Sequence, residues 1–321
     1  MIAIILGLLL IGGVLVFEGD MPAGEVDARY ASYASAFLAR PDGGRVHYRD
    51  EGRRDGYPLV LLHGSNASLH TWEPWVALLG DEYRIVTLDL PGHGLTGRVP
   101  DDDYSTAAYI DTVVAVADHL GLEQFALGGN SMGGGVTWQF ALAHPERVGA
   151  MLLVNATGLW SWREAGPPRG SGTPMAFRLL GQDWFRGIAR HLDSRYLVAQ
   201  GLRASFHDPE LVDDAMVRRY YELSMREGAR AATLIRFGSF RGVAAAAEPD
   251  LSVLSQPTLI LWGEHDALIP PEVGERFVET LPDARLIVYP DAGHIPMEEV
   301  PERSADDVRA FLGVVLGRTA S

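Results

Sequence analysis

The chain has 321 residues, of which 47% are hydrophobic and 21% charged, a composition that fits one large folded domain or two small ones. Its net charge is −15 and it has no basic cluster, which argues against nucleic acid as a partner. It contains no cysteine, which excludes disulfides, thiol nucleophiles and cysteine-bound metals.

The first 17 residues are almost wholly aliphatic and carry no charged side chain. As a helix they would be about 26 Å long, near the lower limit for crossing a bilayer. A cleavable signal peptide usually has a Lys or Arg before its apolar core and a small-residue site after it, and neither is clear here. We therefore expect residues 1–20 to be an uncleaved single-span membrane anchor, with the periplasmic or extracellular side favoured. A signal segment cleaved before secretion, or a buried helix, is the alternative, and residues 21–40 are expected to be an amphipathic connector.

Strand and helix patterns alternate along the rest of the chain. Strands are expected at 44–50, 58–62, 83–88, 123–127, 148–154, 257–262 and 284–289, and several of these are continuous apolar runs. Helices are expected at 71–79, 105–120, 136–144, 272–281 and 304–316. Continuous apolar strands are typical of sheets buried on both faces. The alternation therefore predicts an α/β fold with a mostly parallel, doubly wound sheet.

Residues 158–249 interrupt this alternation with short helical patterns broken by Gly and Pro. We expect this stretch to be a helical cap, inserted into a core made of residues 41–157 and 250–321. The stretch is rich in Trp, Tyr and Phe. These side chains form either the cap's own small core or an apolar substrate pocket beneath it.

A glycine-rich turn between an expected strand and an expected helix carries Ser131. Gly129 and Gly133 flank it in the pattern G-x-S-x-G, which holds a serine hydroxyl above a sheet and beside a helix N-terminus. Side chains at the two glycines would collide with the neighbouring strand and helix. Because the chain has 36 glycines, the pattern has an alternative, a tight turn whose serine only caps the helix.

A serine nucleophile needs a base within hydrogen-bond reach, and the base needs a carboxylate that orients it. His294, in the loop after the last expected strand, is the candidate base. Asp266, which follows strand 257–262, is the candidate acid, with Glu264 as its nearest competitor. Because parallel strands end at one edge of a sheet, where ligands bind, we expect these side chains to meet Ser131 there.

Acyl transfer also needs N–H donors for the negative charge that develops on the carbonyl oxygen. The backbone amides of Ser65 and Met132 are the expected donors, because Ser65 lies in the loop after strand 58–62 and Met132 follows Ser131. His63 is expected to support this loop rather than to react, and Asn66 is a candidate for approaching the substrate. No metal or organic cofactor is expected.

Five motifs in register resemble the α/β-hydrolase superfamily. They are His63-Gly64, Asp89-Leu-Pro-Gly-His-Gly94, Gly129-Asn-Ser-Met-Gly-Gly134, Gly263-Glu-His-Asp266 with Pro270, and Gly293-His294 with Glu298 and Pro301. The resemblance covers about Arg45 to Leu316, including the position of the cap. It implies the α/β-hydrolase fold and a triad in the chain order Ser131, Asp266, His294.

Within the superfamily the sequence around Ser131 is similar to two groups. One is the bacterial esterases and lipases of the cold-adapted type, which often have a hydrophobic N-terminus. The other is the meta-cleavage-product hydrolases, which cut C–C bonds and typically have Gly-Pro-Gly after His-Gly. This chain has Ser65-Asn-Ala-Ser68 at that place, which, with its hydrophobic N-terminus, favours an esterase. Haloalkane dehalogenases and epoxide hydrolases, which use aspartate at the position of Ser131, are disfavoured.

The sequence thus predicts a serine hydrolase that cleaves carboxylic esters through an acyl-enzyme, with C–C bond hydrolysis as the alternative. Ser131 is expected to attack the carbonyl, His294 to take and return its proton, and Asp266 to hold the imidazole. The expected partner is a small apolar ester, and the oligomeric state is left open. Thioesterase or perhydrolase activity would use the same triad, and a non-catalytic binding protein would usually lack a triad member.

Overall fold

The computed structural model describes residues 18–165, 193–239 and 248–317. In this part of the chain eight strands form one sheet with the order β1-β2-β4-β3-β5-β6-β7-β8. The strands are β1 (Ser35–Ala39), β2 (Arg45–Gly52), β3 (Tyr57–Leu62), β4 (Tyr83–Leu88), β5 (Phe125–Asn130), β6 (Val148–Val154), β7 (Thr258–Gly263) and β8 (Ala284–Tyr289). The first two pair antiparallel and the other six are parallel, which confirms the mostly parallel sheet.

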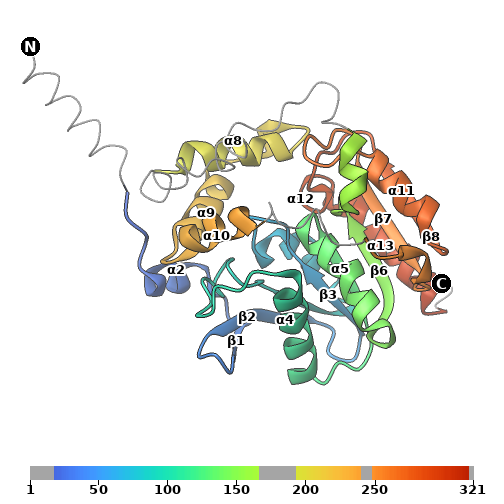
Figure 1. Ribbon diagram of the computed structural model, residues 1–321, viewed down its shortest axis with the longest axis horizontal. Helices are drawn as coiled ribbons and strands as arrows, with labels where there is room; N and C mark the ends of the chain where they lie inside the picture. Colours follow the sequence, from blue (N-terminus) through green and yellow to red (C-terminus); the bar gives the residue numbers. More distant parts are fainter. Residues whose placement is uncertain (1–17, 166–192, 240–247, 318–321) are drawn as a thin grey trace, which may run out of the picture.

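Helices cover both faces of this sheet (Figure 1). The first face carries α4 (Thr106–His119), α5 (Met132–Ala143) and α11 (Glu272–Thr280), and the other carries α3 (Glu73–Leu79) and α13 (Pro301–Val315). The two hydrophobic clusters lie on opposite sides of the strands, because successive side chains of a strand point to opposite faces. Strands β5 and β7 are accordingly buried at every position. The predicted doubly wound arrangement is confirmed.

Three described α-helices lie in the chain between β6 and β7. They are α8 (Arg195–Ser205), α9 (Asp214–Met225) and α10 (Ala229–Ser239), called the inserted helices below. Figure 1 shows them grouped above the sheet in that view. They fall within the cap expected at 158–249, of which residues 166–192 and 240–247 lie outside the described residues. The predicted domain boundaries stay predictions.

The segment expected as a connector packs against the rest of the molecule. It contains α2 (Ala23–Tyr30) and the edge strand β1. Before α2, the backbone of Met21 hydrogen-bonds to Met225 and Glu227, at distances of 2.7 and 2.8 Å.

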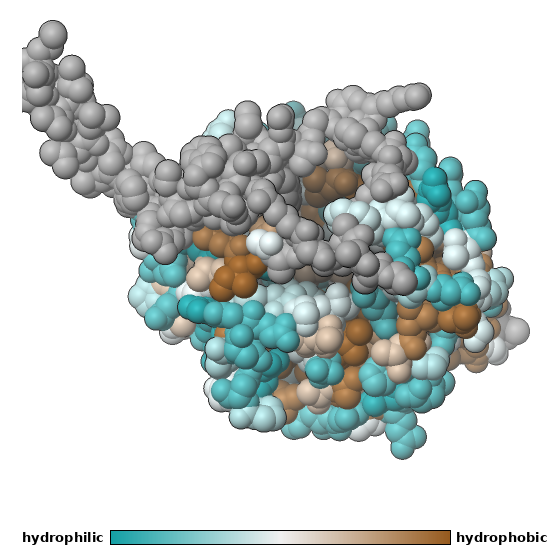
Figure 2. All heavy atoms as spheres, viewed as in Figure 1, coloured by the Kyte–Doolittle hydropathy of each residue, from teal (hydrophilic) through white to brown (hydrophobic). Residues whose placement is uncertain are grey.

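Figure 2 shows hydrophilic and hydrophobic residues interleaved on the face of the molecule seen in Figure 1.

The predicted N-terminal membrane span is corrected by the structure. No helix within the described residues is long and apolar enough to cross a bilayer. Helix α13, at 15 residues, measures about 22 Å, whereas the hydrocarbon core of a bilayer is about 30 Å thick. Residues 1–17, from which the span and the membrane-associated location were predicted, lie outside the described residues.

Candidate active site

Ser131 lies at the junction between β5 and α5. Its backbone has φ 54° and ψ −115°, a conformation that is strained for a residue with a side chain. The turn is held by hydrogen bonds from Ser131 N–H to Val154 O at 3.0 Å and from Thr157 N–H to Ser131 O at 2.9 Å. These bonds tie the turn to the end of β6, and the strand, the strained serine and the helix together have the form expected of a nucleophile elbow.

His294 and Asp266 form a buried pair at the carboxyl ends of β7 and β8. His294 Nδ1 lies 2.7 Å from Asp266 Oδ2, and the two residues are 5% and 4% exposed. The other carboxylate oxygen of Asp266 accepts N–H bonds from Leu268 and Ile269 at 2.7 and 2.9 Å. An ionised carboxylate only accepts hydrogen bonds, so Nδ1 of His294 carries the proton and Nε2 is left to accept one. The competing acid Glu264 is exposed.

A side-chain amide connects the turn that carries Ser131, called the serine turn below, to the loop after β8 that carries His294, called the histidine loop below. Asn130, which directly precedes Ser131, donates from Nδ2 to the carbonyl oxygen of His294 at 3.0 Å and to that of Val154 at 3.2 Å. Asn130 is buried. The structure therefore brings the loops of Ser131, Asp266 and His294 to one edge of the sheet, and the catalytic roles of the three residues stay predictions.

The loop after β3 passes beside the serine. A Cβ placed on Gly64 would lie 3.3 Å from Cβ of Ser131, so Ser65 comes next to the serine turn. Met132 is the first residue of α5, and the first amides of a helix have no partner within it. Both expected oxyanion donors thus lie next to Ser131, and their role stays a prediction.

His63 supports this loop through both of its ring nitrogens. Nδ1 lies 2.7 Å from Gly64 O, and Nε2 accepts from Leu90 N–H at 3.0 Å. Burial, which disfavours the charged imidazole, lowers the pKa of His63 below its ordinary value. A neutral histidine with both nitrogens occupied fits the expected supporting role.

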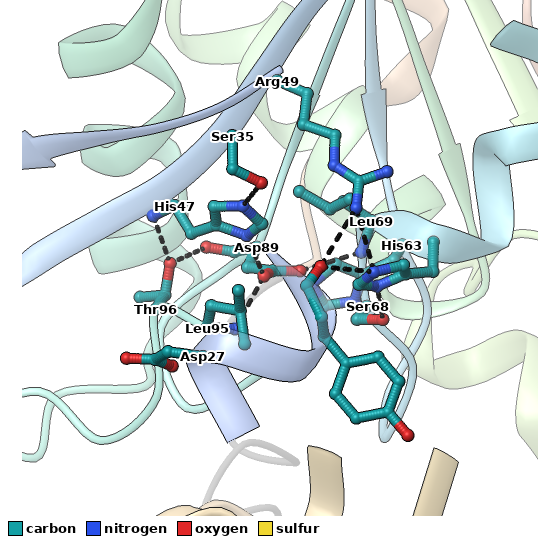
Figure 3. A network of polar contacts seen from close by, with 12 residues as sticks. Asp27, Ser35, His47, Arg49, His63, Ser68, Leu69, Asp89, Leu95 and Thr96 are labelled. Atoms are coloured by element: carbon teal, nitrogen blue, oxygen red, sulfur yellow. Dashed lines mark hydrogen bonds and ion pairs between the residues drawn. The ribbon is translucent and has the colours of Figure 1, made fainter. Parts of the chain in front are cut away.

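Asp89, which follows β4, holds the end of the loop after β3, at Leu69 (Figure 3). Its carboxylate accepts from the N–H groups of Leu69 and Leu95, each at 2.8 Å, and meets His47 Nδ1 at 2.7 Å. Burial alone would raise the pKa of Asp89, but favourable interactions, of which the hydrogen bond from His47 is the largest, outweigh it and hold that pKa well below its usual range. Asp89 therefore stays ionised and orders residues 63–69.

Two further polar residues at this edge were missed in the sequence. Asn155, directly after β6, donates from Nδ2 to Asp266 Oδ2 at 2.6 Å. Glu299 accepts from Gly293 N–H at 2.6 Å and from Asp208 N–H at 2.8 Å, so it connects the histidine loop to the inserted helices. The available signal for Asn155 was its position, because it is a polar residue at the end of a buried strand.

The inserted helices contact the histidine loop directly. His294 N–H donates to the carbonyl oxygen of Ser205, at the end of α8, at 2.7 Å. Beside this segment, the imidazole rings of His207 and His265 stack with centroids 3.9 Å apart. The loop that carries His294 is therefore positioned partly by the insertion. Over the described ranges, no group of three or more His, Asp or Glu side chains is placed to hold a metal ion.

Comparison with known proteins places these features in a family. A family model described as alpha/beta hydrolase fold matches residues 57–301. The 2-hydroxymuconate semialdehyde hydrolase of Pseudomonas putida is 30% identical over 277 residues, covering 84% of this chain and 91% of that protein. Lipase 1 of Psychrobacter immobilis is 24% identical over 285 residues, covering 87% of this chain and 84% of the lipase.

A solved structure extends the similarity over the full length. The crystal structure titled as a membrane phospholipase A, a novel bacterial virulence factor, has a TM-score of 0.74 and 26% identity, and the match covers 100% of both chains. The sequence motifs, the fold and these similarities agree. The chain belongs to the α/β-hydrolase fold family.

Proposed function

We propose that the protein is a serine hydrolase that cleaves carboxylic esters through an acyl-enzyme. The observation that carries the proposal is the buried Asp266–His294 pair, with a distance of 2.7 Å. The loop of this pair is hydrogen-bonded to Asn130, which directly precedes Ser131, a serine with a φ of 54°. A neutral imidazole whose Nδ1 donates to a carboxylate has Nε2 available as a base. This is the arrangement that activates a serine hydroxyl.

In this mechanism Ser131 attacks the ester carbonyl while His294 takes its proton and passes it to the leaving alcohol. Asp266 holds the imidazole in the required tautomer and stabilises its cation. The amides of Ser65 and Met132 bind the oxyanion, and each such donor contributes about 3 kcal/mol to transition-state stabilisation. Water then attacks the acyl-enzyme with His294 as the base again, which releases the acid.

Ester substrates are supported by two of the similarities. Lipase 1 is similar over most of its length, and the phospholipase structure matches from end to end. The similarity to 2-hydroxymuconate semialdehyde hydrolase favours a second candidate, hydrolysis of a C–C bond in a ring-fission product. The same three residues would serve in either reaction, so the substrate distinguishes the two.

The test compares wild type with Ser131→Ala on p-nitrophenyl butyrate and on a ring-fission dienone acid. We expect wild type to hydrolyse p-nitrophenyl butyrate faster than the dienone acid. We expect Ser131→Ala to lower the rate of ester hydrolysis by at least about a thousandfold. Ser252→Ala, which changes an exposed serine before β7, is the matched control and should leave the rate unchanged. Full activity of folded Ser131→Ala would refute the nucleophile, and preference for the dienone would favour C–C hydrolysis.

A further inference from the structure

A pocket lies between the loops that follow β3 and β4 and the inserted helices α9 and α10. The cavity is small, about 30 Å³. Its polar side chains are those of Asn66, Ser68, His93, Tyr220, Ser224 and Thr233. Polar groups in a ligand pocket fix the orientation of a ligand and select it. A ligand that fits this lining carries oxygen or nitrogen atoms of its own.

Asn66 has a fixed orientation at the edge of this pocket. Its backbone is in the left-handed region, with φ 61°, and its Oδ1 accepts from Arg236 Nη2 at 2.6 Å. A guanidinium group only donates hydrogen bonds, so the amide oxygen faces Arg236 and the amide nitrogen points elsewhere. No partner for Nδ2 of Asn66 occurs among the described residues. The two N–H groups are therefore available to a ligand.

Arg236 is itself rigidly held. It is 2% exposed and lies on α10, and its Nη1 contacts His93 Nε2. His93 Nδ1 lies 3.1 Å from Pro91 O and donates to it, so Nε2 is free to accept. Burial, followed by the charge of Arg236, lowers the pKa of His93 well below its ordinary value, which keeps the ring neutral. The orientation of Asn66 is thus set by a buried chain of contacts.

Asn66 also lies close to the proposed reaction centre. It directly follows Ser65, whose amide is a proposed oxyanion donor, and adjacent Cα atoms are about 3.8 Å apart. Gly64, on the other side of Ser65, would bring a Cβ within 3.3 Å of Cβ of Ser131. Asn66 therefore lies one residue from the proposed oxyanion donor and two residues from the backbone that contacts Ser131.

We propose that Asn66 is a specificity-determining residue whose amide N–H groups bind an oxygen atom of the substrate beside the scissile ester. This inference rests on the proposed ester hydrolysis and narrows its substrate class. The substrates are esters of polyols such as glycerol, whose remaining oxygens lie three or four bonds from the ester oxygen. An ester of a simple aliphatic alcohol has no atom to accept this bond.

The test uses glycerol 1-monobutyrate and propyl butyrate, which differ only in the two hydroxyl groups of the glycerol ester. The measured quantity is the ratio of kcat/KM for the glycerol ester to kcat/KM for the propyl ester. Asn66→Asp keeps an oxygen facing Arg236 and removes the N–H donors, and Asn66→Gly removes the side chain while tolerating the left-handed backbone. We expect wild type to prefer the glycerol ester and both variants to lower the ratio about tenfold.

The ratio separates recognition from general effects on catalysis. A new charge beside the oxyanion, or a shifted loop, would lower both rates together and cancel in the ratio. A wild-type ratio near one, or an unchanged ratio in folded variants, would overturn the role of Asn66 while leaving ester hydrolysis intact. If wild type hydrolyses neither ester and Ser131→Ala changes nothing, the proposed function itself fails.

Discussion

Asn155 and Asp266 share a short buried hydrogen bond, 2.6 Å from Nδ2 to Oδ2. The same carboxylate oxygen meets Nδ1 of His294 at 2.7 Å. Asn155 has a φ of 44° and is fully buried, and its Nδ2 also lies 3.3 Å from Gly293 O. It therefore holds both the proposed acid and the loop that carries the proposed base, which makes it a positioning residue in the proposed mechanism.

Asn155→Ala should lower kcat about tenfold with little change in KM, because Asp266 loses one donor and the imidazole is held less firmly. The free energy of unfolding should fall by about 1–3 kcal/mol. Steady-state kinetics on p-nitrophenyl butyrate and urea denaturation measure the two effects. Asn155→Asp should lower both kcat and the free energy of unfolding further than Asn155→Ala does, since it places a second carboxylate beside Asp266. A change confined to KM would mean that Asn155 acts on the substrate instead.

Glu299→Gln tests the connection between the inserted helices and the histidine loop. Both carboxylate oxygens of Glu299 accept backbone N–H bonds, from Gly293 and Asp208, and a glutamine can keep only one of them. We expect kcat to fall about threefold to tenfold and stability to fall by about 1–3 kcal/mol. Glu302→Gln, at an exposed position of α13, is the matched control. If Glu299→Gln and Glu302→Gln have the same kcat and the same stability, the contacts of Glu299 do not connect the inserted helices to the histidine loop in a way that matters for catalysis.

Gly133→Ala and Gly135→Ala probe the close packing of the serine turn. A Cβ at Gly133 would lie 2.3 Å from the carbonyl oxygen of Leu62, whereas one at Gly135 would lie 3.3 Å from Cβ of Thr157. Gly133→Ala should therefore destabilise the protein by about 3 kcal/mol or more, because backbone must move. Gly135→Ala should change stability by about 1 kcal/mol or less, since helix propensity offsets the tighter contact. Thermal denaturation of both variants decides the comparison.

The buried His70 should make stability depend on pH. Burial, and after it the charge of Arg49, lower the pKa of His70 to about 4, against opposing effects of Asp89 and Glu73. Because this folded pKa lies below the unfolded value of about 6.5, the unfolded chain takes up the proton first as the pH falls. The contribution is fully present above about pH 6.5 and is lost between about pH 6.5 and pH 4, by roughly 3 kcal/mol in total.

The measurement is urea denaturation of wild type and His70→Gln at about pH 7.5 and about pH 4.5. Wild type should lose more stability between the two conditions than His70→Gln. His119→Gln, at an exposed histidine of α4, is the control and should behave like wild type. Identical pH dependence in wild type and His70→Gln would show that folding does not lower the pKa of His70.

Local sequence patterns predicted most of the sheet, because apolar strands and their flanking turns are determined by nearby residues. Strand 83–88 and the Ser105 cap of α4 occur as predicted. Helix α5 begins at Met132, four residues before the predicted start, since Gly133, Gly134 and Gly135 read as non-helical. Glycine occurs in this helix because neighbouring segments approach it closely, as the end of β3 does at Gly133, and leave no room for a side chain. Helix propensity does not include such contacts between distant segments.

Contacts between distant segments were the least predictable part of the site. Asp266 and His294 could be paired from their positions after strands, and the structure places them 2.7 Å apart. Arg236 lies 170 residues from Asn66 in the sequence, and no local pattern connects them. The isolated arginine in an otherwise apolar part of α10 was the available signal, and its partners depend on how the insertion packs. The roles of Ser131, Asp266, His294, Ser65 and Met132 stay predictions until the variants are measured.

The hydrogen bond from His294 N–H to the carbonyl oxygen of Ser205 limits how the insertion can be exchanged. Inserted segments of this kind are natural targets for grafting between relatives to change substrate range. A graft that replaces residues 193–239 would have to provide a carbonyl at the position of Ser205 and an N–H at the position of Asp208, or His294 would lose its support. A chimaera that keeps this chain's own residues up to 208 and takes the rest of the insertion from a relative should therefore keep more activity than one in which the relative's sequence begins before residue 205.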